Sequence, residues 1–137
     1  MDLHDIFKPK QETPHPFLVG AATEEVARTM ANMLWKHRAR DIALYKVDTT
    51  TVVADYYLIC TCGSNTHMKS AAEDLMYDME LCGISEARLE GRFGSTWMLI
   101  DFGEIIVHIF NQESRDFYHL DHLMGEEQKI PLVFPED

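Results

Sequence analysis

The sequence predicts an α/β domain built on a mixed sheet of about five strands flanked by helices. Apolar residues at helical spacing mark long segments, and short runs of β-branched and aromatic residues lie between them. The stretch 17–130 contains no proline, a residue excluded from the interior of helices and sheets. A chain of 137 residues with 46% hydrophobic residues can bury one core of ordinary size, so we expect one globular domain.

Three helices are expected. The first covers 24–40, with Thr23 as N-cap, and its apolar spacing comes from Val26, Met30, Met33 and Leu34. The second begins after Ser64, also an N-cap, and ends at Gly83. Its apolar positions are Met68, Ala71, Ala72, Leu75, Met76 and Met79. The third covers 112–123, where the apolar residues are Phe117, Leu120 and Leu123.

Strands are expected at 42–48, 56–61 and 87–90, with a polar link at 49–51. The order strand, helix, strand over 56–90 indicates a parallel crossover. Residues 95–110 are expected to form a hairpin that turns at Phe102 and Gly103. That turn would pair Asp101 with Glu104, Leu99 with Ile106 and Trp97 with His108. One hairpin face is wholly apolar and is assigned to the core: Met98, Ile100, Ile105, Val107 and Ile109.

The opposite hairpin face mixes aromatic, aliphatic and ionisable residues: Trp97, Leu99, Asp101, Glu104, Ile106, His108 and Phe110. An apolar centre with a polar rim is typical of a protein-binding hot spot. The alternative, weighted equally, is that a helix covers this face and that His108 is a core histidine with its hydrogen bonds satisfied. The predicted partner-binding residues are Trp97, Asp101, Phe102, Glu104, His108 and Phe110.

The charge is distributed unevenly. Residues 1–40 carry five acidic and six basic side chains, whereas 41–137 carry eighteen and six, which gives the body of the protein a net charge of −12. A surface this negative repels nucleic-acid phosphates and anionic lipid, and it favours a basic protein partner. The first twenty residues lack the apolar run of a signal peptide, and we expect a cytoplasmic protein that does not bind membranes.

Other candidate sites are weak. Gly63 and Ser64 lie at a strand-to-helix turn where a phosphate could bind, but phosphoryl transfer needs a pair of metal-binding carboxylates and the following strand offers only Glu90. Asp116, His119 and His122 recur every third residue, as zinc ligands or exposed polar residues would. Cys60 and Cys62 would place both thiols on one face of a strand, and packing explains them at least as well as a site would. We therefore expect no catalytic residue, metal or cofactor.

Several motifs, in order and at matching spacing from the first helix to Leu123, closely resemble the Iojap family of ribosomal silencing factors. They are Asp48, 54–57, Gly63-Ser64, Glu90-Gly91, Trp97, 101–103, 107–110 and 115–120. Two positions differ from the family pattern: Phe102 stands where the family usually has tyrosine, and Met124 stands where tryptophan is common. The predicted domain is 23–124, with tails at 1–22 and 125–137.

The resemblance implies a nucleotidyltransferase-like fold without the catalytic carboxylates, and a factor that is not an enzyme. It implies binding to ribosomal protein fourteen of the large ribosomal subunit, which blocks association with the small subunit and lowers translation when nutrients are scarce. Two alternatives stay open: an enzyme acting on a nucleotide, suggested by Gly63-Ser64, and a homodimeric adaptor that pairs through a sheet edge or an apolar face.

Overall fold

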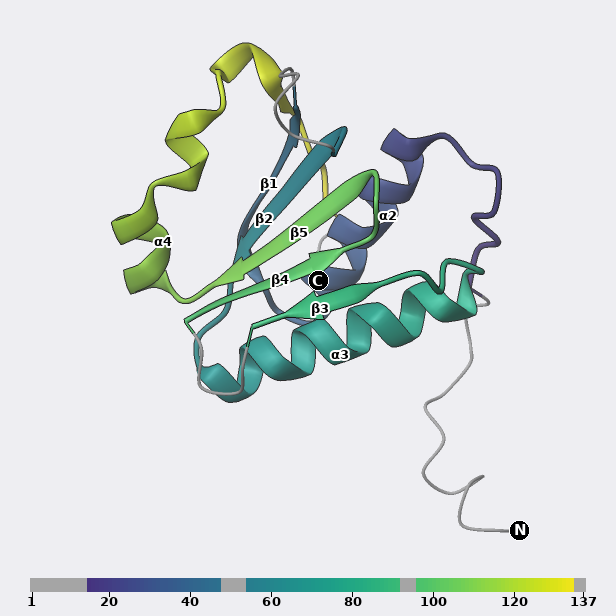
Figure 1. The fold of residues 1–137 in the computed structure, drawn as a ribbon, viewed down its shortest axis with the longest axis horizontal. Coiled ribbons are helices and arrows are strands. Elements are labelled where there is room, and N and C mark those ends of the chain that lie inside the picture. Colours follow the sequence, from purple (N-terminus) through teal and green to yellow (C-terminus); the bar gives the residue numbers. More distant parts are fainter. Residues whose placement is uncertain (1–14, 48–53, 92–95, 135–137) are drawn as a thin grey trace, which may run out of the picture.

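The computed structural model describes residues 15–47, 54–91 and 96–134. Within these residues, three α-helices and two short 3-10 helices flank one sheet (Figure 1): α2 (Thr23–Lys36), α3 (Asn65–Leu81), α4 (Gln112–Tyr118), η1 (Leu120–Leu123) and η2 (Glu126–Gln128). The strands are β1 (Arg40–Lys46), β2 (Tyr56–Thr61), β3 (Arg88–Glu90), β4 (Trp97–Asp101), β5 (Ile105–Phe110) and β6 (Lys129–Ile130). The predicted α/β class with a mixed sheet is confirmed.

In the described part of the chain the sheet has six strands, in the order β3-β4-β5-β2-β1-β6. Only β2 and β5 pair in parallel, and every other neighbouring pair is antiparallel. The predicted crossover from β2 through α3 to β3 does return in the parallel direction. Its two strands are not neighbours, however, because β4 and β5 lie between them.

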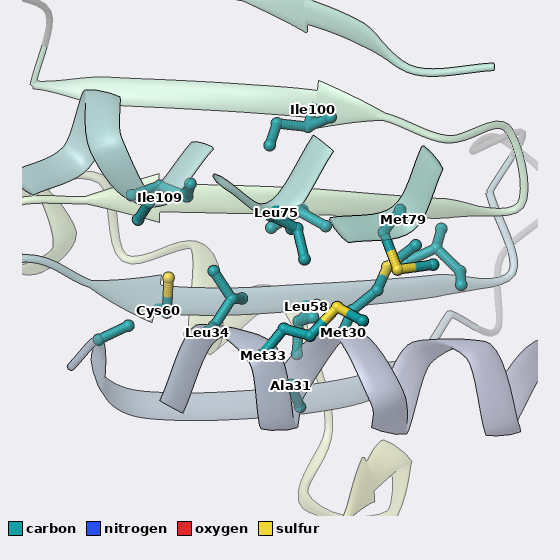
Figure 2. Packing of buried hydrophobic residues seen from close by; sticks show 14 of the residues in the cluster. Met30, Ala31, Met33, Leu34, Leu58, Cys60, Leu75, Met79, Ile100 and Ile109 are labelled. Carbon is teal, nitrogen blue, oxygen red and sulfur yellow. The ribbon is translucent and has the colours of Figure 1, made fainter. Parts of the chain in front are cut away.

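Helices α2 and α3 pack on the same face of the sheet, which we call the helix-covered face (Figure 1). Figure 2 shows how their apolar side chains meet those of the central strands, with Leu34 and Leu75 facing Leu58, Ile100 and Ile109. All five of these side chains are fully buried. The apolar hairpin residues assigned to the core from sequence all belong to this cluster: Met98, Ile100, Ile105, Val107 and Ile109.

The ends of α2 differ from the prediction. Thr23 is not the N-cap: Ala22 occupies that position without a side-chain bond, and the Thr23 hydroxyl instead donates to Oε2 of Glu104 at 2.8 Å. The helix stops at Lys36 rather than residue 40, because Arg38 adopts a left-handed conformation with φ of 67° and Arg40 already belongs to β1.

The predicted ends of α3 are confirmed. The Ser64 hydroxyl accepts a hydrogen bond from the backbone N–H of His67 at 3.0 Å, as an N-cap does. Gly83 follows the C-cap with φ of +91°, and a side chain there would meet Val19 at 2.6 Å. Glycine is therefore required both for the backbone conformation and for the close approach of the N-terminal segment.

The hairpin register is shifted by two residues from the prediction. Leu99 pairs with His108 and Trp97 with Phe110, because the two-residue loop is Gly103-Glu104 rather than Phe102-Gly103. Gly103 supplies the positive φ, and its N–H donates to Oδ1 of Asp101 at 2.7 Å. A shift of two keeps each strand residue on its predicted face, since side chains alternate with period two.

The polar link at 49–51 lies outside the described residues. The segments that precede and follow the predicted domain 23–124 pack against that domain. Leu18 is buried in the main core, and its N–H donates to the carbonyl of Cys82. At the other end, β6 pairs with β1, and Phe134 stacks on Trp35 with ring centroids 5.9 Å apart. The boundaries 23–124 are thus too narrow for the folded unit.

Candidate partner-binding face

The face of the sheet turned away from α2 and α3, which we call the outer face, carries the mixed hairpin residues. By register it is formed by Ala43, Tyr45, Tyr57, Ile59, Trp97, Leu99, Asp101, Ile106, His108 and Phe110. A second, smaller apolar cluster lies here around Ile59, Phe110 and Leu120. Leu120 of η1 and Met124 pack against the side chains of β1 and β2 on this face, and α4 lies near the end of β5 (Figure 1). Tyr57, Trp97, Leu99 and Ile106 remain half-exposed.

Aromatic rings form the centre of the outer face. Phe110 is fully buried beneath Trp97, whose ring centroid lies 4.9 Å away, and Tyr118 covers Trp97 at 4.8 Å. Tyr57 packs edge-on against His108 at 4.7 Å. The face therefore presents a rigid, partly accessible aromatic surface supported by a buried layer.

His108 is a buried polar residue with an incomplete set of hydrogen bonds. The indole Nε1 of Trp97 donates to Nδ1 of His108 at 3.1 Å, so the neutral imidazole carries its proton on Nε2. That Nε2 has no hydrogen-bond partner among the described residues. Burial disfavours the charged ring and lowers the pKa of His108 to about 4, against the opposing effect of Asp121. The alternative of a core histidine with all its hydrogen bonds satisfied is therefore wrong for Nε2, although His108 is buried and its Nδ1 is bonded.

The structure brings together only some of the predicted site residues. Trp97, Asp101, His108 and Phe110 share the outer face, with His108 and Phe110 buried in it. Phe102 packs instead against the main core on the helix-covered side. Glu104 bonds Thr23 at the start of α2, so the prediction that it shares the face of Trp97 is wrong. Phe102 and Glu104 lie next to or within the turn at 103–104, and both side chains lie on the helix-covered side. The alternation of side chains along the two strands does not predict orientations at the turn.

A polar network beside this face was not predicted. The Arg115 guanidinium donates to both carboxylate oxygens of Asp121, at 3.0 and 2.9 Å, and to the hydroxyl of Thr61 at 2.9 Å. Tyr45 donates to the same carboxylate at 3.0 Å. We call Tyr45, Thr61, Arg115 and Asp121 the Arg115 network. The only sequence signal was the position of Arg115 in a family motif.

Ionisation stabilises this network. Burial alone would raise the pKa of Asp121, but the hydrogen bonds and charge of Arg115, with the Tyr45 bond, outweigh it and hold the pKa below its ordinary value. Burial, then the bond to Asp121, raises the pKa of Tyr45 to about 12. Near neutral pH the network therefore contains a carboxylate, a guanidinium and a neutral phenol.

Two backbone donors at the start of α3, near Gly63-Ser64, are bonded to side chains of the same turn. The N–H of Gly63 donates to Nδ1 of His67 at 3.1 Å, and Nε2 of that ring donates to the carbonyl of His37 at 2.7 Å. The Ser64 hydroxyl holds the N–H of His67. The N–H groups of Gly63 and His67 are therefore already bonded within the chain, and Glu90 on β3 is exposed at the sheet edge.

The predicted helix at 112–123 breaks at His119, which is left-handed with φ of 52°. Asp116 accepts from Gln112, while the rings of His119 and His122 lie 4.7 Å apart. No group of three potential ligands capable of holding a metal occurs in the described part of the chain. Cys60 and Cys62 are buried in the main core. In the same residues, no helix is long and apolar enough to cross a bilayer.

A family model described as "Ribosomal silencing factor during starvation" matches residues 21–137. The ribosomal silencing factor RsfS of Bacillus subtilis is 32% identical over 97 residues, which cover 71% of this chain and 82% of that protein. The chloroplastic protein Iojap of Zea mays is 29% identical over 108 residues, covering 79% of this chain and 47% of that protein.

A crystal structure of a protein from Chromobacterium violaceum has the same fold, with a TM-score of 0.71 at 23% identity over 82% of this chain and 92% of that one. The family match extends over most of the chain and includes both the outer face and the Arg115 network. The resemblance drawn from the motifs is confirmed, and the chain belongs to the RsfS family of ribosomal silencing factors, to which Iojap proteins are related.

Proposed function

We propose that this protein binds the large ribosomal subunit through ribosomal protein fourteen and blocks its association with the small subunit, which represses translation when nutrients are limited. It acts by occupying a surface and not by catalysis. The observation that carries the proposal is the outer face, where half-exposed Trp97 is supported by buried Phe110 and His108. Its expected location is the cytoplasm, with the ribosomes.

The proposed contact is the accessible part of the outer face. Trp97 supplies the central aromatic anchor, with Tyr57, Leu99 and Ile106 around it, and such aromatic anchors dominate the binding energy of protein interfaces. Asp101 lies at the rim and can meet a basic side chain. His108 and Phe110 support the contact from beneath, whereas Phe102 and Glu104 take no part in it because they lie on the other side.

Charge supports a basic protein as the partner. Because 41–137 carries a net charge of −12, approach to a basic ribosomal protein is favoured and approach to ribosomal RNA is not. Attraction between exposed charges is screened by salt, so the affinity should fall as ionic strength rises. An affinity that does not depend on salt would mean that apolar contacts alone hold the complex.

The decisive experiment measures subunit joining. Purified small and large subunits are mixed with magnesium ions, with and without the protein, and the joined particle is quantified by sedimentation. We expect the joined fraction to fall as the protein is added, and free large subunits to carry it. An unchanged joined fraction at saturating protein would overturn the proposal. Large subunits lacking ribosomal protein fourteen should no longer retain the protein.

A further inference from the structure

Helix α4 turns two polar side chains, Ser114 and Arg115, toward the protein and leaves the ring of Phe117 in solvent. Ser114 is buried and its hydroxyl bonds the carbonyl of Thr96, while Arg115 reaches Thr61 on β2. Phe117, by contrast, is 76% exposed. A surface helix normally buries its apolar residues, so the exposure of Phe117 next to the exposed carboxylates Glu113 and Asp116 is unusual.

The exposed apolar residues continue beyond α4. Tyr118 is 49% exposed and Leu123, on η1, is 75% exposed. The rings of Phe117 and Tyr118 meet edge-on at 5.1 Å, and Tyr118 in turn contacts Trp97 at 4.8 Å. The apolar surface of α4 is thus continuous with the outer face through Tyr118. Contiguous exposed apolar surface of this kind marks an interaction site more often than single exposed residues do.

Polar bonds hold this exposed segment in place. Asn111 caps α4 by accepting from the N–H of Ser114 at 2.8 Å, and Asp121, just after the break at His119, is clamped by Arg115 through two bonds. These hydrogen bonds tie the segment to β2 and β1, and the buried side chain of Leu120 packs between them into the smaller apolar cluster of the outer face. A pre-ordered apolar residue loses little conformational entropy on binding.

The charge around this segment indicates the kind of partner. Residues 112–128 contain one basic side chain besides the histidines, Arg115, and it is already paired with Asp121. The acidic side chains are Glu113, Asp116, Asp121, Glu126 and Glu127. Glu113 lies four residues before Phe117 on the same helix side. An exposed phenyl ring surrounded by carboxylates fits a basic protein surface that has an apolar hollow. The same carboxylates repel the phosphates of RNA.

We propose that Phe117, carried on α4, forms a second contact that inserts into an apolar hollow on a basic ribosomal protein. This inference rests on the proposed function and extends its contact from the outer face to α4. It assigns Arg115 as a positioning residue, because its bonds hold the segment that presents Phe117.

The chain offers a matched control for Phe117. Phe17 is also 76% exposed, but it lies beside Gly83, at the C-terminal end of α3 on the helix-covered side. Binding of wild-type, Phe117→Ser and Phe17→Ser proteins to purified large subunits is measured by co-sedimentation. We expect Phe117→Ser to weaken binding about tenfold or more and Phe17→Ser to leave it unchanged. Equal thermal unfolding midpoints would show that both variants fold.

Charge reversal provides a second variant. Glu113→Lys should weaken binding several-fold, and more at low salt than at high salt, whereas Glu80→Lys, on an exposed position of α3, should not. The identity of the partner is tested by placing the photo-crosslinking residue p-benzoylphenylalanine at position 117 or at position 17 before irradiation with large subunits. Crosslinking of a basic ribosomal protein from 117 alone is the expected result.

The outcomes separate this inference from the proposed function. If wild-type protein does not co-sediment with large subunits, the proposed function is overturned and this contact with it. If wild-type protein binds and Phe117→Ser binds equally well, the second contact is overturned while the proposed function stands. A crosslink from position 117 to ribosomal RNA or to a second copy of this chain would also overturn the contact.

Discussion

Trp97 and His108 form a diagonal pair on the outer face, with the indole N–H donating to Nδ1 of the imidazole at 3.1 Å. Trp97 faces Phe110 and His108 faces Leu99 in the strand register, so the bond crosses between two rungs of the ladder. It fixes the orientation of the indole and the tautomer of the imidazole together. The half-exposed ring is therefore held ready for a partner by a residue that is itself buried.

Acid should destabilise the fold through His108. Its pKa falls from 6.5 to about 4 on folding, so between these values the unfolded chain binds more protons than the folded one. Above pH about 6.5 His108 is neutral in both states and does not lower the free energy of unfolding. As the pH falls from about 6.5 to about 4, the free energy of unfolding should fall by about 3 kcal/mol in all. Urea unfolding at a series of pH values measures this slope.

His108→Phe removes the titrating group from this site. The variant should lose the dependence on pH between about 6.5 and 4 that His108 causes. His122→Gln, at an exposed position, is the control and should keep the wild-type slope. A His108→Phe slope identical to that of wild type would show that other groups cause the acid sensitivity.

Trp97→Ala should weaken binding to the large subunit strongly and leave the domain folded. The side chain is only partly buried, so truncation is expected to lower the free energy of unfolding by about 1–3 kcal/mol, within the usual range for single substitutions. Loss of an aromatic anchor at an interface weakens binding by about 2 kcal/mol or more. Co-sedimentation and thermal unfolding measured on the same preparation check both expectations. Complete unfolding would mean that Trp97 is mainly a core residue.

Arg115→Lys should loosen α4 without unfolding the sheet. Lysine cannot form the two parallel bonds to Asp121 or reach Thr61 at the same time, so a loss of about 1–3 kcal/mol is expected. Amide hydrogen exchange should accelerate in α4 and η1 and remain unchanged in α3. Unchanged exchange in α4 would show that its other bonds, such as those of Ser114, are sufficient.

Phe134→Ala should destabilise the fold more than the neighbouring Val133→Ala. Phe134 is half-buried and stacks on Trp35, whereas Val133 is 88% exposed. We expect a loss of about 1–2 kcal/mol for Phe134→Ala and less than about 0.5 kcal/mol for Val133→Ala in urea unfolding. Equal effects would contradict a structural role for the C-terminal segment.

The sequence predicted elements where the local pattern dominates. The apolar spacing in α3 correctly predicted which side of the helix is buried. Ser64 and Gly83 correctly predicted its two ends, because helix caps depend on residues that are close in sequence. The first helix was predicted four residues too long because nothing local marks Arg38 as left-handed. Strand β6 was missed because two residues at 129–130 form a strand only by pairing with β1.

The candidate site was predicted in part. Alternation along the hairpin placed Trp97, Asp101, His108 and Phe110 on one face, since parity survives a register shift of two. Phe102 and Glu104 were misplaced because they flank or form the turn, where alternation ends. The Arg115 network joins residues as far apart as Tyr45 and Asp121, and no single-sequence pattern reports such a distant contact.

The position of β1 between β2 and β6 has a consequence for synthesis. β1 is made early, and β6 only after every other strand has been completed. While the chain is growing, the far side of β1 therefore has backbone N–H and C=O groups without their final partners, a template on which nascent chains can aggregate. Arg40 and Lys46, charged and exposed at the two ends of the strand, would discourage such pairing until the final strand closes the sheet.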